Sequence, residues 1–287
     1  MDIEIPHAGP DAAAGPATAV GLLLAAAAIG ACAWAAARLV ARARRGQPPV
    51  DWRPHGPVAW NGGDVAFVGL VYAACQILAA GLVPRPPTVP GQLAASAAAM
   101  LAATIISMAH LRGRGGPQAT LGIALGRLGD DTRLGLGALA LIVAPLLALA
   151  AAVDRIVPYR HPIIDFLAAH RDPVAIAMVA ASAVIVAPIA EEFLFRRVLQ
   201  GWLEKLLAPG SENAGSGSWR GPALALTLSA VAFAAAHVGQ GLAWVPLFFF
   251  GIVTGVLARQ TGSIVPGIIL HGLFNAVSVV LVLWQTR

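Results

Sequence analysis

Residues 190–197 read AEEFLFRR and follow an uncharged apolar run that extends from Pro173 to Ile189. An ionised side chain near the centre of a bilayer costs roughly 2.5–3.5 kcal/mol on insertion scales. Helix formation alone does not explain why two adjacent carboxylates, Glu191 and Glu192, stand at the end of such a run. The stretch predicts a membrane-spanning helix that carries polar chemistry at one end.

The rest of the chain also has the composition of a membrane protein. Its 287 residues are 58% hydrophobic and 11% charged, whereas soluble domains carry about 25% charged residues. The net charge of +5 is modest and its cations cluster between apolar runs, so we expect no nucleic-acid partner. Cys32 and Cys75 each stand alone in an apolar stretch and are interpreted as helix residues, not as a disulfide or metal site.

Apolar runs of about 17–25 residues match a hydrocarbon core of roughly 30 Å and predict an all-α polytopic membrane protein with about eight transmembrane helices. Lys and Arg are unevenly divided among the loops: with the N-terminus outside, fourteen fall inside and five outside. This asymmetry predicts that both termini lie outside. The expected spans are 17–37, 64–83, 92–111, 134–153, 173–195, 222–238, 243–258 and 264–284.

Three regions follow from this layout: a short outside tail (1–16), an N-terminal four-helix membrane region (17–172) and a C-terminal domain (173–287) that carries the polar site among the last four helices. Residues 44–63, rich in Pro and Gly, are expected to form an irregular inner connection. Residues 122–133 are expected to form a short interfacial helix before the fourth span.

Three polar sets occupy the last four spans. In the first, Glu192 and Arg196 stand at i,i+4 and can pair, while Glu191 projects about 100° away. The second set is His237, four residues after Phe233. The third is His271 and Asn275, which share one helix face. Taken alone, the first set is explained by a structural ion pair, the second by a satisfied core or interfacial histidine and the third by a hydrogen-bonded helix contact. A single shared polar pocket explains all three together.

Two kinds of chemistry fit such a pocket. In peptide hydrolysis Glu191 suits the base that deprotonates water, and the amide of Asn275 suits an oxyanion donor. His237, His271 and Glu192 could hold a divalent metal such as zinc; alternatively the imidazoles act directly on the substrate or relay protons. A proton-coupled transporter uses similar buried carboxylates and imidazoles, so both classes stay open at this point.

Other protease signatures are absent from the sequence. It contains no His-Glu-x-x-His and no Gly-x-Ser-Gly. Asp64 has no second intramembrane Asp as partner and is interpreted as the polar start of the second span.

The three sets in this order resemble the CPBP intramembrane proteases, the group that contains the type II CAAX prenyl endopeptidases and bacteriocin-processing or immunity relatives. The family pattern is Glu-Glu-x-x-x-Arg, then Phe-x-x-x-His, then His-x-x-x-Asn, on separate helices. The matching residues here are 191–196, 233–237 and 271–275, and the resemblance covers about 173–285. One departure is Arg197, where relatives commonly carry Gly.

The resemblance implies an intramembrane endopeptidase. It implies Glu191 as the water-activating base and Glu192 with Arg196 as a supporting pair. His237 and His271 would hold the metal or orient the substrate, and Asn275 would be the oxyanion donor. The implied partners are membrane lipid and a peptide or protein substrate at the cytoplasmic membrane surface. Some family members act without proteolysis, as scaffolds or immunity factors, so a non-catalytic interaction protein is a further alternative.

The heavy use of Ala, Gly, Pro and Arg is typical of a GC-rich bacterial gene, so we expect the apolar spans to lie in the plasma membrane of a bacterium. One geometric difficulty concerns His237. At 1.5 Å per residue, Glu191 and His271 both fall toward the inner side, whereas His237 falls about 22 Å from Pro222, too far outward for a common pocket. A deeper start of the sixth span, strong helix tilt or a break at Pro188 would each resolve it.

Overall fold

The structure is a computed structural model that describes residues 16–114, 122–123, 125–157, 166, 173–209 and 220–285, and the expected tail at 1–16 therefore lies almost wholly outside the described residues. The secondary structure of these residues is helical. The elements are α1 (Pro16–Arg44), α2 (Gly62–Leu82), α3 (Val89–Arg112), η1 (Leu125–Arg127), α5 (Leu128–Asp154), α7 (Pro173–Ala180), η2 (Ala181–Val186), α8 (Ala187–Glu191), η3 (Glu192–Gln200), α9 (Gly201–Leu207), α10 (Arg220–Ala235), α11 (Trp244–Thr261) and α12 (Val265–Gln285).

In the described part of the chain, seven helices are long and apolar enough to cross a membrane, which confirms the all-α polytopic class. The sixth expected span, 222–238, corresponds to α10, which is apolar but has only 16 residues. Residues 173–207 form one continuous rod of 35 residues. Two stretches of this rod, η2 and η3, have π-helical hydrogen bonding, which commonly marks functional positions in helices.

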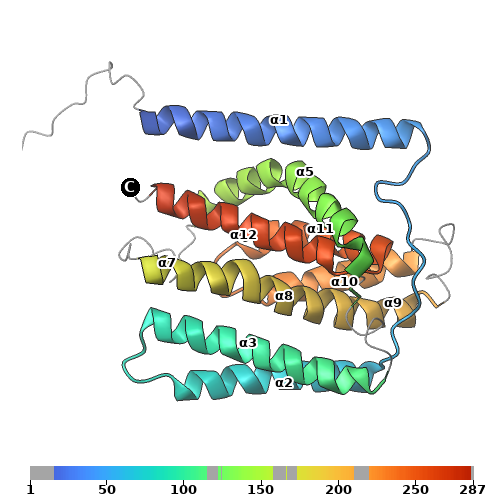
Figure 1. Ribbon diagram of the computed structural model, residues 1–287, viewed down its shortest axis with the longest axis vertical. Coiled ribbons are helices and arrows are strands. Elements are labelled where there is room, and N and C mark those ends of the chain that lie inside the picture. Colours follow the sequence, from blue (N-terminus) through green and yellow to red (C-terminus); the bar gives the residue numbers. More distant parts are fainter. Residues whose placement is uncertain are drawn as a thin grey trace, which may run out of the picture.

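The helices lie side by side, with α1 at one edge and the α2–α3 hairpin at the opposite edge (Figure 1). The start of α1 and the end of α12 lie on the same side of the bundle, as expected for an even number of crossings. Helix α5 is bent in this view, and Pro145 inside it accounts for the bend, because proline removes a helical hydrogen bond and clashes with the preceding turn.

A connecting segment runs across the helix ends opposite the C-terminus (Figure 1). This segment, residues 45–61, is called the inner strap below; as expected for 44–63, it lacks regular helix or strand. Its Arg53 forms an ion pair with the buried Asp131 of α5 and donates its backbone N–H to the carbonyl of Gln260 (2.9 Å). Trp60 donates its indole N–H to the carbonyl of Val198 (3.0 Å). The strap is therefore fixed to α5, η3 and α11.

The expected separate helix at 122–133 is wrong for the described residues of that segment. A single 3-10 turn, η1, leads directly into α5, which begins at Leu128. Its first turn contains Asp130 and Asp131, and acidic residues favour a helix N-terminus because they complement the helix dipole. The helix therefore starts earlier than hydropathy alone indicates.

Candidate active site

Two of the predicted catalytic residues, Glu192 and Arg196, form a buried ion pair within the rod 173–207. Arg196 Nε lies 3.6 Å from Glu192 Oε2, and both side chains are completely shielded from solvent. Arg196 also donates through Nη1 to Ser229 Oγ of α10 (2.9 Å), and this hydroxyl donates to the carbonyl of Phe195 (2.9 Å). The predicted pairing at i,i+4 is confirmed, and Ser229 supplies a polar contact that the sequence analysis missed.

His271 on α12 lies against both carboxylates. Its Nδ1 is 3.3 Å from Glu192 Oε1, and its Nε2 is 3.8 Å from Glu191 Oε2. The side chain of Glu191 retains 15% of its exposure, compared with none for Glu192. The structure thus brings together four of the predicted site residues, and of the two carboxylates Glu191 is the more accessible.

Aromatic rings enclose this cluster. Phe233 and Phe250 approach the His271 ring edge-on, with centroids 5.9 and 5.0 Å away. The guanidinium of Arg196 lies 5.1 Å from the centre of the Phe233 ring. These apolar rings limit the access of water and lower the local dielectric, so that charge interactions in the cluster are stronger than in water.

His237 lies beyond the C-terminal end of α10, in a turn. Its Nδ1 is 2.9 Å from the carbonyl of Phe233, and its ring is 5.1 Å from the Phe233 ring. Since Phe233 also contacts His271, one aromatic ring links the two histidines. The rod is not broken at Pro188, which is buried near the start of α8. His237 therefore lies at the periphery of the site and is connected to His271 through the Phe233 ring.

Asn275 follows His271 by one helical turn. Its amide donates to the carbonyl of Ala183 in η2 (2.7 Å), so one of its two N–H groups is used within the protein. The other can still donate. This contact fixes the side chain against the rod that carries Glu191.

Two glycines let α12 approach the rod. An added Cβ at Gly267 would lie 2.6 Å from Glu192 Oε2, and one at Gly272 would lie 2.6 Å from the carbonyl oxygen of Val184. Both distances are shorter than real contacts permit. Glycine at 267 and 272 is therefore what brings His271 close to the carboxylates.

Tyr72 of the N-terminal region reaches the same rod, supported by Thr104. The Tyr72 hydroxyl of α2 donates to the carbonyl of Ala190 (3.2 Å) and shares a hydrogen bond with the Thr104 hydroxyl of α3 (2.7 Å). Ala190 immediately precedes Glu191. A hydroxyl group within an apolar span indicates in the sequence that such a contact exists. Which group it binds depends on the tertiary structure.

The described residues include no group of three or more His, Cys, Asp or Glu side chains arranged to hold a metal ion. Of the predicted ligands, Glu192 and His271 are in contact, whereas His237 approaches them across the Phe233 ring. As placed, these residues do not fit a three-ligand zinc site. We therefore derive no step through a metal, and the zinc ion stays a prediction.

Several buried polar atoms of the cluster have no hydrogen-bond partner among the described residues: Glu191 Oε2, Glu192 Oε2, and Arg196 Nε and Nη2. Buried polar groups are normally hydrogen-bonded. Donors and acceptors thus remain around His271 for a polar ligand.

The cluster lies within a segment of the chain that matches a known protein family. Residues 173–277 match the family described as type II CAAX prenyl endopeptidase Rce1-like. This segment of the chain is therefore similar to the CPBP/CAAX protease family. The matched segment contains all six predicted catalytic residues and leaves residues 1–172 outside. Neither the curated proteins nor the solved structures include a match to the chain.

This similarity indicates a protease, and a protease acts on a peptide or protein substrate. Together with the apolar helices it also supports an integral membrane protein.

Proposed function

We propose that this CAAX-type protease hydrolyses a peptide bond within the membrane with a water molecule activated by Glu191. The observation that carries the proposal is the position of His271, which directs one ring nitrogen toward Glu191 and the other toward Glu192. Glu191 is the more accessible of the two carboxylates, and Glu192 is already paired with Arg196. Because of this difference in accessibility and pairing, we assign the role of base to Glu191 and that of the supporting pair to Glu192 and Arg196.

In the proposed reaction, Glu191 accepts a proton from water, and the hydroxide attacks the carbonyl carbon of the scissile bond. The remaining N–H of Asn275 donates to the developing oxyanion. When the tetrahedral intermediate collapses, the C–N bond breaks and the proton passes to the leaving amine from Glu191 or through His271. Arg196 and Glu192 keep His271 in position, and the Phe233 and Phe250 rings exclude bulk water.

The substrate is proposed to be a peptide whose C-terminus resembles a CAAX sequence, presented at the cytoplasmic surface of a bacterial plasma membrane with both protein termini outside. The family description supports the substrate class. The distribution of Lys and Arg supports the orientation.

The test uses the purified full chain in detergent and a farnesylated CAAX-type peptide beside its unprenylated counterpart, with cleavage followed by mass spectrometry. We expect Glu191→Gln to reduce the cleavage rate by about 10²-fold or more, because a general base contributes roughly 10²–10⁴-fold. Asp130→Asn is the control, since it makes the same carboxylate-to-amide change at an exposed position of α5 away from His271.

Cleavage at the wild-type rate by the Glu191→Gln protein would refute the assigned base. If neither peptide is cleaved and proteoliposomes instead show proton-coupled substrate flux, the transporter alternative replaces the protease. If His271→Ala and Asn275→Ala leave the biological effect of the protein unchanged, the non-catalytic alternative is supported.

A further inference from the structure

The rod 173–207 changes its helical winding on both sides of the candidate base. The π-helical stretches η2 and η3 flank the short α-helical segment α8, which ends at Glu191. π-Helical hydrogen bonds join residues five apart instead of four, and such stretches are rare in proteins. Two of them so close together indicate that the surroundings of the rod stabilise this winding.

Side chains from other elements donate to backbone carbonyls of the π-helical stretches. In η3, the Ser229 hydroxyl of α10 donates to the carbonyl of Phe195 (2.9 Å). Trp60 of the inner strap donates its indole N–H to the carbonyl of Val198 (3.0 Å). In η2, the carbonyl of Ala183 accepts from α12 in the same way (2.7 Å). A carbonyl has two lone pairs and can accept such a bond in addition to a helical one, so these donors fix the positions of the carbonyls.

The two donors to η3 are themselves held firmly. Ser229 is completely buried, and its hydroxyl also accepts from Nη1 of Arg196 (2.9 Å), the partner of Glu192. One hydroxyl therefore connects the backbone of η3 with the buried ion pair. Trp60 is only 1% exposed, and the guanidinium of Arg197 lies 5.4 Å from the centre of its ring.

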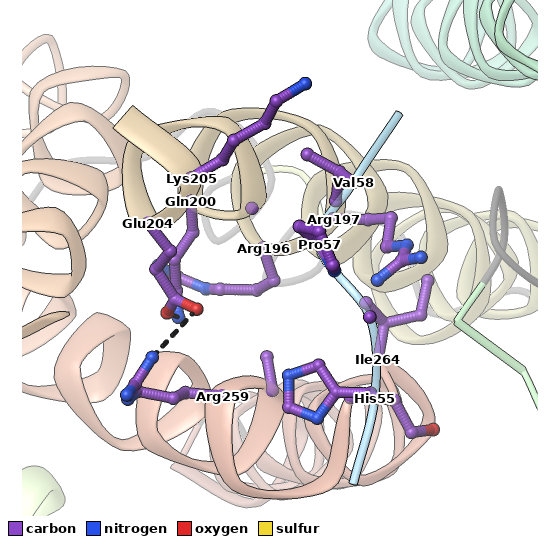
Figure 2. Close-up of a pocket in the computed structure, with 15 residues that line it drawn as sticks. His55, Pro57, Val58, Arg196, Arg197, Gln200, Glu204, Lys205, Arg259 and Ile264 are labelled. Atoms are coloured by element: carbon purple, nitrogen blue, oxygen red, sulfur yellow. Dashed lines mark hydrogen bonds and ion pairs between the residues drawn. The ribbon is translucent and has the colours of Figure 1, made fainter. Parts of the chain in front are cut away.

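The inner end of η3 is fixed to α11 and cannot take up a change in winding. Figure 2 shows Glu204 of α9 paired with Arg259 of α11 (3.2 Å). Gln200, the last residue of η3, donates to Glu204 (2.9 Å) and to the carbonyl of Gly255 (2.9 Å). One residue of a helix corresponds to a rotation of about 100°. A return of η3 to α-helical winding would therefore turn the opposite end, which carries Glu191, by about this angle.

We propose that Ser229 and Trp60 are positioning residues that hold η3 in its π-helical winding and thereby direct Glu191 toward His271. Loss of either contact frees a carbonyl of η3 and allows the segment to rewind, which turns Glu191 away from the imidazole nitrogen 3.8 Å from it. The effect on catalysis rests on the proposed function, whereas the effect on the winding does not. Trp60 lies outside the matched segment 173–277, so a residue of the N-terminal region takes part in orienting the base.

The experiment compares Ser229→Ala and Trp60→Phe with two controls in the full chain. Ser107→Ala also removes a buried hydroxyl, but one without a partner among the described residues. Trp34→Phe makes the same ring change at a position of α1 that is 57% exposed. Hydrogen–deuterium exchange of peptides that cover residues 190–200 reports on the winding, and steady-state cleavage of the CAAX-type peptide reports on the orientation of Glu191.

We expect residues 190–200 to exchange about fivefold faster in both test variants than in the wild type, because each variant loses one hydrogen bond to this segment. Ser229→Ala should lower kcat about tenfold and Trp60→Phe about fivefold, with KM unchanged. The larger effect of Ser229→Ala follows from its second hydrogen bond, to the charged Arg196. Both controls should match the wild type in exchange and in kcat.

A rise in KM at unchanged kcat would overturn the positioning role. Exchange at the wild-type rate in both test variants would overturn the role in the winding, whatever the kinetics. Faster exchange in a protein that cleaves no peptide would support the role in the winding and refute the proposed function, so the two failures are distinguishable. Trp60→Phe keeps the test decisive if Ser229→Ala does not fold, since the two donors reach η3 from different elements.

Discussion

Both halves of the molecule bury charged side chains, but the N-terminal half buries them at helix starts, as at Asp64 and Asp131. Between the rod 173–207 and α12, the structure encloses charged and polar side chains, among them Glu192, Arg196 and His271. Helices α1 and α2 instead present large apolar side chains outward, such as Leu23 and Leu70. Lipid can satisfy an apolar surface, but a charge needs several helices around it. The comparison teaches that the site requires the close packing of the C-terminal half.

The N-terminal half is attached to this packed half by a shared apolar cluster, which includes Val68, Leu111 and Phe193, and by several polar contacts. Tyr72 reaches the carbonyl beside Glu191, and Arg53 and Trp60 of the strap reach α5 and η3. We interpret α1–α3 as a support that acts through these contacts. Four predictions test the difference between the halves, in order of decreasing effect.

The largest effect is expected at the buried pair. Glu192→Ala leaves the Arg196 guanidinium buried without its carboxylate, and breaking a buried ion pair costs about 3–5 kcal/mol. We expect the free energy of unfolding in detergent to fall by this amount, as measured by chemical denaturation. The double variant Glu192→Leu/Arg196→Met removes both charges and should recover most of the loss; equal destabilisation of the single and double variants would contradict the pairing.

The next largest difference between the two halves is expected in how they tolerate the substitution of a glycine. Gly272→Ala places a Cβ against the Val184 carbonyl, and overpacking of this kind costs about 1–3 kcal/mol. The matched substitution Gly69→Ala in α2 meets no atom within 4 Å and should stabilise the protein by about 0.5–1 kcal/mol, because alanine favours helix over glycine. Thermal unfolding of both variants measures the contrast. Changes of the same sign would show that α12 and α2 are equally loosely packed.

A smaller and purely functional effect is expected at Tyr72. Tyr72→Phe removes only the hydroxyl that fixes the Ala190 carbonyl, and we expect kcat to fall about 3- to 10-fold with KM unchanged, the size of one hydrogen bond. Steady-state cleavage of the peptide described above measures this. Ser107→Ala is the control on α3, since the Ser107 hydroxyl is buried without a partner among the described residues. A change in KM alone would contradict a positioning role.

The smallest effect is expected on α1. Leu23 is 69% exposed, and surface substitutions away from specific contacts stay within about 0.5 kcal/mol. Leu23→Ala should therefore leave both Tm and the cleavage rate at wild-type values. A clear loss of either would show that α1 contacts more than lipid.

The sequence predicted the helical class and the local part of the site well. Glu192 and Arg196 pair because four residues on one helix suffice to bring them together, and no tertiary information is needed. Gly251 and Gly255 have the four-residue spacing of a close helix contact, and an added Cβ at either would press on α10, at Ala230 and Leu226. The position of Glu191 beside His271 was predicted only as a member of a shared pocket.

The remainder depended on contacts between distant segments. His237 lies just beyond the end of α10 at Ala235, and the Phe233 ring contacts both histidines. This contact depends on how α10 packs against α12, which hydropathy does not show. The π-helical hydrogen bonding of residues 192–200 could not be predicted, because this short charged stretch has no hydrophobic periodicity that would indicate it. The partner of Tyr72 lies 118 positions away, beyond any local pattern.

The inner strap has a consequence for biosynthesis. Its anchoring groups are made in sequence: the strap itself comes early, whereas Asp131, Val198 and Gln260 emerge from the ribosome much later. The Asp131 anchor is completed by Ser263, which donates to its second carboxylate oxygen (2.7 Å). The first three helices therefore enter the membrane with their connecting segment undocked, and the strap reaches its final position only when the last two spans have been translated.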